Sequence, residues 1–98
     1  MPYAIIAKDK PHSLELRTKL RPAHMEYLKG HKARILASGA LLDDDGSGGD
    51  ASLIIYDTDD RAEAEAFIAN DPFNKGGLFE SVTVRRWRKA IFAGELLV

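Results

Sequence analysis

The order of strand-like and helical stretches constrains the fold of this 98-residue chain more than any other feature. Four short apolar runs have the composition or the alternation of β-strands, and helical stretches with apolar residues at three- and four-residue steps lie between the first two and the last two. The strand-like runs cover residues 3–8, 35–42, 51–56 and 80–87. The order βαββαβ predicts an α+β, ferredoxin-like fold, a four-stranded antiparallel sheet with both helices on one face. A chain of this length supports one modest core, so we expect a single domain over residues 1–98.

The first helical stretch contains a proline. Ser13 is a typical N-cap residue before the apolar positions that start at Leu14. Pro22 lacks an amide donor and disfavours helical geometry at the residue before it. We therefore expect a broken helix, with a short segment before Pro22 and a second segment from Pro22 to Leu36.

Turn and cap signals delimit the second half of the chain. Residues 43–50 are acidic and rich in glycine, which indicates a flexible hairpin tip. They lack the alternating ligands and the final glutamate of a calcium-binding loop. Asp60 and Glu63 have the spacing of a capping box at the start of the second helix, and Pro72 is expected to end that helix.

The predicted sheet leaves one face without a helical cover. Many of its strand residues are apolar, so a second copy of the chain is the economical cover, and we expect a homodimer. The tail, residues 90–98, is also apolar enough to pack on something, and a partner subunit is one candidate.

Charge and composition exclude several functions. The chain has 14 basic and 15 acidic residues, a formal net charge of -1, so no global field favours nucleic acid or an anionic membrane. The one basic run, residues 85–89, surrounds Trp87 and is interpreted as an edge-strand or dimer-contact feature. Cysteine is absent, and no apolar stretch approaches the roughly 20 residues that span a bilayer. The expected location is the cytoplasm.

Two proton-transferring side chains lie at unusual positions, on the apolar stripes of predicted helices. His24 follows Arg21-Pro22-Ala23 on the stripe of the first helix, and Asp71 lies in the segment Asn70-Asp71-Pro72-Phe73 at the end of the second. A histidine titrates near neutral pH and serves as general acid or base. A carboxylate at a helix C-terminus is repelled by the exposed carbonyls, so Asp71 is locally unfavourable there. A bonded core histidine and a turn-forming Asp-Pro are the structural alternatives.

If the two side chains meet, Asp71 would orient the His24 imidazole and stabilise its protonated form. We expect the two helices to run roughly parallel, so that their ends do not automatically coincide.

Other residues are candidates for substrate binding. Arg17 and Arg21 would each hold an anionic group bidentately, although a solvated helix face is the simpler explanation for either one. Ser38 and Gly39 on the second predicted strand would supply a hydroxyl and close backbone approach. His24 and His31 are seven residues apart, too far for a pair of zinc ligands on adjacent turns, so no metal is expected.

Several of these segments resemble the YciI-like (YCII-related) family, in the family's order and over nearly the whole chain. They are residues 3–10, 13–17, 21–24, Gly39, 70–73, 76–79 and 82–84. The resemblance implies a dimeric α+β barrel of ferredoxin-like subunits and an active site whose His–Asp pair corresponds to His24 and Asp71. One branch of the family resembles a dehydrochlorinase of a chlorinated hydroxyhydroquinone. The tip at residues 43–50 departs from the family by lacking a proline-containing stretch.

These observations favour a cofactor-free lyase, isomerase or dehydrochlorinase that acts on a small polar aromatic or unsaturated substrate. In this hypothesis His24 transfers the proton, Asp71 orients it, and Arg17 or Arg21 holds an anionic group. The alternative is a non-catalytic dimeric module that binds a small ligand or regulates a partner. A purely structural His–Asp pair is a third interpretation.

Overall fold

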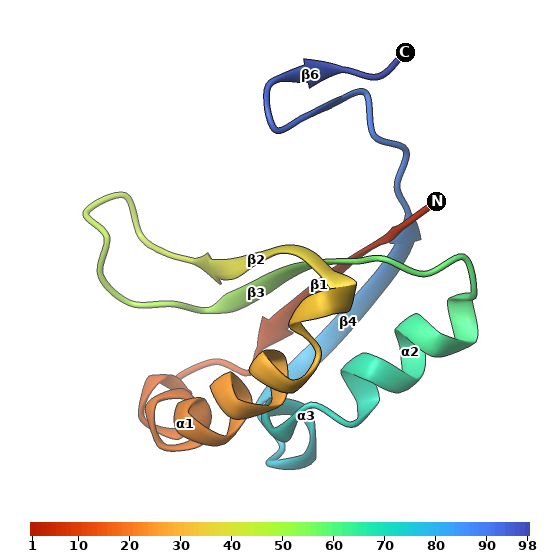
Figure 1. Ribbon diagram of the computed structural model, residues 1–98. Helices are drawn as coiled ribbons and strands as arrows, with labels where there is room; N and C mark the ends of the chain where they lie inside the picture. Colours follow the sequence, from red (N-terminus) through yellow and green to blue (C-terminus); the bar gives the residue numbers. More distant parts are fainter.

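The computed structural model describes all 98 residues and has the α+β architecture that the sequence predicts (Figure 1). An antiparallel sheet has the strand order β2-β3-β1-β4, with the helices on one of its faces. A separate two-stranded ribbon, β5-β6, follows the sheet. The elements are β1 (Tyr3–Asp9), α1 (Leu14–Gly30), the 3-10 turn η1 (Lys32–Arg34), β2 (Ile35–Leu41), β3 (Ala51–Tyr56), α2 (Arg61–Ala69), α3 (Pro72–Lys75), β4 (Phe79–Arg86), β5 (Ile91–Phe92) and β6 (Glu95–Leu96).

The central strand β1 places its alternate residues in the core. It pairs along its length with β3 and β4, and its side chains at Tyr3, Ile5, Ala7 and Asp9 are buried beneath the helices. Apolar residues of α1, α2, α3 and the neighbouring strands complete one core cluster. This burial supplies the main driving force for folding, and it holds α1 and α3 close enough to touch.

The expected break at Pro22 is wrong. A single helix, α1, runs from Leu14 to Gly30 with Pro22 inside it. The proline lies on the exposed side of the helix, where water can bond the carbonyl left without a partner. The buried side chains of Arg17, His24 and Leu28 hold both halves of the helix against the sheet. The helix also ends at Gly30, earlier than predicted.

The predicted helix caps are only partly confirmed. The Asp60 carboxylate accepts a hydrogen bond from the Ala62 amide, as an N-cap should. The capping box is wrong, because the Glu63 carboxylate accepts instead from the Thr58 hydroxyl at 2.6 Å and from Arg34 at 2.9 Å. These partners, the Thr58 hydroxyl foremost, lower the pKa of Glu63. Ser13 is at the N-cap position of α1 without making a side-chain cap bond.

The two main helices run in opposite directions, so the expectation of parallel helices is wrong. Strands β1 and β3 are antiparallel. Helix α1 follows β1 and runs back along the sheet, and α2 does the same after β3 (Figure 1). The start of α1 therefore lies at the same end of the sheet as the end of α2. This arrangement brings the first helix to the segment around Asp71.

The remaining face of the sheet and the tail are unpartnered. Residues that pair across the strands on this face include Ile6 and Leu53, and Ile6 is 44% exposed. Beyond β4 the chain leaves the body as an arm, residues 89–98, which stands on this open side of the sheet (Figure 1). No helix of the structure is long and apolar enough to cross a membrane.

Candidate functional site

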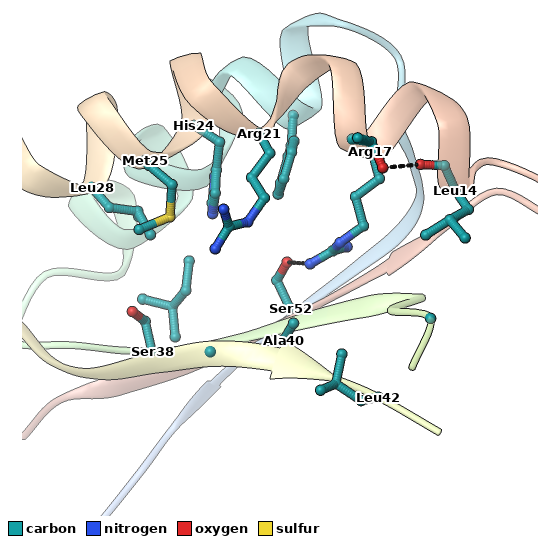
Figure 2. Close-up of a pocket in the computed structure, with 15 residues that line it drawn as sticks. Leu14, Arg17, Arg21, His24, Met25, Leu28, Ser38, Ala40, Leu42 and Ser52 are labelled. Atoms are coloured by element: carbon teal, nitrogen blue, oxygen red, sulfur yellow. Dashed lines mark hydrogen bonds between the residues drawn. The ribbon is translucent and has the colours of Figure 1, made fainter. Parts of the chain in front are cut away.

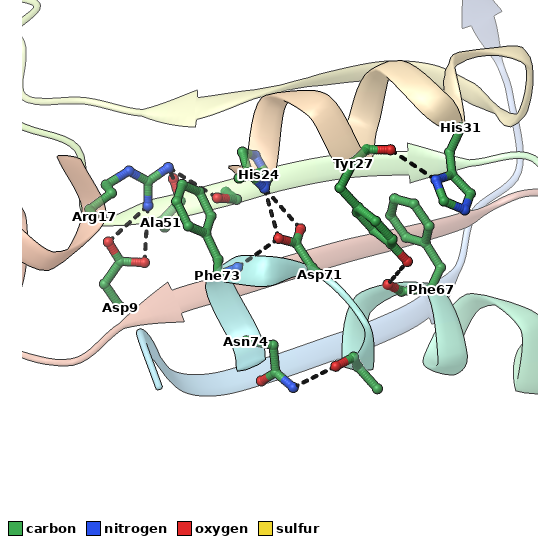
Figure 3. A network of polar contacts seen from close by, with 12 residues as sticks. Asp9, Arg17, His24, Tyr27, His31, Ala51, Phe67, Asp71, Phe73 and Asn74 are labelled. Atoms are coloured by element: carbon green, nitrogen blue, oxygen red, sulfur yellow. Dashed lines mark hydrogen bonds and ion pairs between the residues drawn. The ribbon is translucent and has the colours of Figure 1, made fainter. Parts of the chain in front are cut away.

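His24 and Asp71 are in direct contact. The His24 Nδ1 lies 2.8 Å from Oδ1 and 3.0 Å from Oδ2 of the Asp71 carboxylate (Figure 3). Asp71 is completely buried and His24 is 6% exposed. Because Nδ1 faces a carboxylate, it carries the hydrogen and donates it, which leaves Nε2 as the free nitrogen.

Asp71 is held by the start of a short helix that the sequence analysis did not predict. Its Oδ1 also accepts a hydrogen bond from the Phe73 amide at 2.9 Å, so Asp71 is the N-cap of α3. Helix α2 ends two residues earlier, at Ala69 with Asn70 as its cap. The expected repulsion at a helix C-terminus is therefore wrong. Asp-Pro is a typical N-cap and first-residue pair, and that was the available signal for α3.

The imidazole is fixed on its flat side as well. The rings of His24 and Phe73 stack with centroids 3.8 Å apart and an interplanar angle of 12°. The Arg17 guanidinium lies over the same phenyl ring, 4.9 Å from its centroid. Phe73 thus connects the arginine to the histidine, as the order of side chains in Figure 3 shows.

His24 Nε2 opens into a pocket of about 380 Å³ between α1 and the β2 side of the sheet (Figure 2). Nε2 makes no hydrogen bond within the protein. Every buried side-chain nitrogen or oxygen has a hydrogen-bond partner, so Nε2 is exposed to solvent. The pocket has a mixed polar and apolar lining. Its lining residues are Leu14, Arg17, Thr18, Arg21, His24, Met25, Leu28, Ser38, Gly39, Ala40, Leu42, Gly48, Ser52, Ile54 and Phe73.

The two candidate arginines differ in availability. Arg17 is buried and donates to both oxygens of Asp9, at 3.0 and 2.8 Å, and to the Ser52 hydroxyl at 3.0 Å. Its NH2 group also donates to the Ala51 carbonyl at 3.3 Å. Arg21 is exposed, lines the pocket and forms no hydrogen bond or ion pair. The guanidinium that is free to meet an anion is that of Arg21.

The sequence-based candidates Ser38 and Gly39 also lie on this pocket, on β2. Asp9, Ser52 and Phe73 were not predicted as part of the site. Asp9 ends a strand on the buried side, where a lone carboxylate requires a cationic partner, and this was a usable signal.

A second aromatic and polar cluster lies farther along α1. The Tyr27 hydroxyl donates to the Phe67 carbonyl at 2.7 Å, and burial, followed by the nearby Asp71 charge, raises the pKa of Tyr27. His31 Nδ1 donates a hydrogen bond to the Tyr27 carbonyl at 2.8 Å. The His31 ring packs on the rings of Tyr27 and Phe67, away from the pocket of His24. No group of three or more His, Asp or Glu side chains is arranged to hold a metal ion.

The fold and the site define a class of protein: a ferredoxin-like α+β domain with a buried His–Asp pair at a pocket between its first helix and its sheet. The YCII-related domain profile matches residues 1–88. The chain is 33% identical over 96 residues to the protein YciI of Escherichia coli O6:H1, covering 91% of this chain and 98% of that protein. It is 31% identical over 96 residues to an uncharacterized protein of Haemophilus influenzae, with the same coverage. The chain belongs to the YCII-related family.

A solved structure of similar fold has a defined activity. It is the 5-chloro-2-hydroxyhydroquinone dehydrochlorinase TftG of Burkholderia phenoliruptrix AC1100, in complex with 2,5-dihydroxybenzoquinone. The TM-score is 0.82 and the sequence identity 36%, with 90% of this chain and 94% of that chain covered.

Proposed function

We propose that this chain is an enzyme of the lyase or isomerase type that moves a proton on a small polar ring, with His24 as the acid–base group. The observation that carries the proposal is the His24–Asp71 contact, which leaves Nε2 facing the pocket. The likeness of the chain to a solved dehydrochlorinase supports the same class of reaction.

In this mechanism His24 Nε2 accepts a proton from a C–H or O–H group of the substrate, and the electron pair enters the conjugated ring. Asp71 stabilises the resulting imidazolium through Nδ1, as the carboxylate does in Ser-His-Asp sites. The proton returns to another atom in an isomerisation. In a dehydrochlorination, the electron pair of the C–H bond forms a C=C bond as chloride leaves the neighbouring saturated carbon, and His24 then passes its proton to water, so HCl is lost overall. Neither reaction requires an oxidant or a reductant.

Arg21 is the proposed anchor for an acidic oxygen of the substrate. It is the pocket cation without a protein partner, whereas Arg17 is engaged by Asp9 and supports the pocket wall. Ser38 and Gly39 on β2 are the proposed contacts on the sheet side. A ring such as a hydroxyquinone offers an anionic oxygen for Arg21 and apolar faces for the rest of the lining.

We also propose that the chain acts as a homodimer. The apolar side chains on the open face of the sheet, Ile6 and Leu53 among them, form a surface that a second copy would bury. Sedimentation of the wild-type chain tests this part of the proposal independently of activity.

The test of the chemistry is replacement of His24 by alanine, with His12→Asn as the matched control for an exposed histidine outside the pocket. Both variants are checked for folding by circular dichroism and assayed with halogenated hydroxyquinones and lactones. We expect activity to be lost in His24→Ala and retained in the control. Activity unchanged in His24→Ala would refute the assignment, and binding without any turnover by the wild type would favour the ligand-binding module.

A further inference from the structure

The arm beyond β4 has a defined shape and an exposed apolar side. Ala93 and Gly94 both have positive φ, 51° and 80°, as the two central residues of a tight hairpin turn require. The cross-strand pair Ile91 and Leu96 therefore lies on one side of the ribbon, 65% and 70% exposed. The family profile ends at residue 88, so the arm lies outside the part of the chain that defines the family.

The arm is anchored only at its root. The Trp87 amide donates to the Pro2 carbonyl at 2.9 Å, and Trp87 and Phe92 make an edge-to-face contact. Beyond this point the hydrogen bonds of the arm are internal, such as the one from the Leu97 amide to the Ala90 carbonyl. An isolated two-stranded ribbon is marginal in water, so this one requires a cover for its apolar side.

The pocket has a complementary, uncovered rim. Leu14, Met25 and Leu42 all line it and are 54%, 45% and 52% exposed. The rim adjoins β2, the edge strand of the sheet, one side of which has no strand partner. An apolar rim beside a free strand edge is a surface that a ribbon with an apolar side can cover.

We propose that the arm of one copy covers the β2 edge and the pocket rim of a second copy, so that Ile91 and Leu96 complete the partner's site. This inference rests on the homodimer proposed above. The arm stands on the open side of the sheet, where a second copy would lie (Figure 1). The arm leaves the sheet at the corner where β4 ends, beside Tyr3, whereas the rim residue Leu42 follows the end of β2 at the opposite corner, beside Ala51. A two-fold axis between two facing sheets, along the diagonal that joins their other two corners, superposes these two corners. It carries the arm, which follows β4, to the partner's pocket.

The absence of cysteine makes disulfide crosslinking a clean test. The variant Leu96→Cys/Leu42→Cys is oxidised at low protein concentration and run on a non-reducing gel. We expect a covalent dimer. The matched control, Leu96→Cys with Glu65→Cys on the exposed side of α2, should stay monomeric on the gel. A two-fold axis along the diagonal through the end of β4 would bring the two arms together instead, so rapid crosslinking of Leu96→Cys alone would overturn the proposal.

A second measurement leaves the pocket side chains unchanged. Hydrogen exchange of the β2 amides is compared between the full chain and a chain without residues 89–98. We expect protection of β2 in the full chain and at least a tenfold faster exchange after the deletion. Equal exchange rates, or a wild-type chain that sediments as a monomer, would overturn the proposal. Neither readout involves catalysis, so the role of His24 stands or falls separately.

Discussion

Replacing Asp71 by asparagine changes one atom of the site and reverses its hydrogen bonding. Both carboxylate oxygens lie within 3.0 Å of His24 Nδ1, so either orientation of the new amide places its NH₂ group against that nitrogen. The orientation that keeps the bond from the Phe73 amide also keeps Oδ1 2.8 Å from Nδ1, but it puts the NH₂ group in place of the second oxygen, 3.0 Å away, where one donor faces another. The strain is relieved when Nδ1 gives up its hydrogen and Nε2 takes one. The nitrogen that faces the pocket then no longer accepts a proton.

The expected loss of activity follows from two effects. A hydrogen bond to a charged group contributes about 1.5–3 kcal/mol, and losing it from the imidazolium slows proton transfer about 10- to 100-fold. The wrong tautomer adds to this loss, and the corresponding change in Ser-His-Asp enzymes lowers kcat about 10⁴-fold. We therefore expect Asp71→Asn to lower kcat about 10²- to 10⁴-fold. The fold should survive, because the side chain keeps its volume and an acceptor for the Phe73 amide.

The assay combines nitrogen NMR of the imidazoles with steady-state kinetics. We expect the His24 hydrogen to move from Nδ1 to Nε2 in Asp71→Asn, whatever the substrate proves to be. The control Asp57→Asn removes one negative charge from an exposed carboxylate and should change neither the tautomer nor the rate. If the tautomer changes in a folded variant while kcat stays within about twofold of the wild type, His24 is not the base, and the reasoning is refuted.

Three further changes test the rest of the structure. Arg17→Met leaves the Asp9 carboxylate buried without its partner and should destabilise the fold by about 3–5 kcal/mol in urea unfolding, with partial recovery in Arg17→Met/Asp9→Leu. Burial holds the pKa of Tyr27 above its usual value of 10.0, so stability should be full below about pH 10 and fall as the pH rises further, and this fall should be shallower in Tyr27→Phe. Gly76→Ala places a Cβ 2.5 Å from a Leu20 methyl, which should destabilise the fold by about 1 kcal/mol. We expect calorimetry to show a Tm that is lower by about 4–8 °C.

The sheet and the two main helices could be predicted because each is encoded by local patterns. The strand at 51–56 is apolar except for Ser52 and lies between turn residues, and its predicted bounds are those of the structure. The Pro22 break could not be judged locally. Whether a proline interrupts a helix depends on the packing of both halves, here through Arg17, His24 and Leu28. The direction of the helices, in contrast, followed from the predicted strand order, because antiparallel neighbouring strands make the helices that follow them antiparallel.

The different environments of Arg17 and Arg21 show what the sequence cannot supply about a site. The two residues are one helical turn apart, on the pocket side of α1. Their roles differ because of Asp9, the last residue of β1. Its carboxylate lies in the core and pairs with Arg17. A buried carboxylate without a partner is far more costly than an exposed guanidinium, so the first arginine is engaged by the fold and the second is left for a ligand. We therefore expect Arg21 to bind the anionic group of the substrate. Arg21→Gln should raise KM roughly tenfold with kcat unchanged, whereas variants of Arg17 should alter stability before they alter binding.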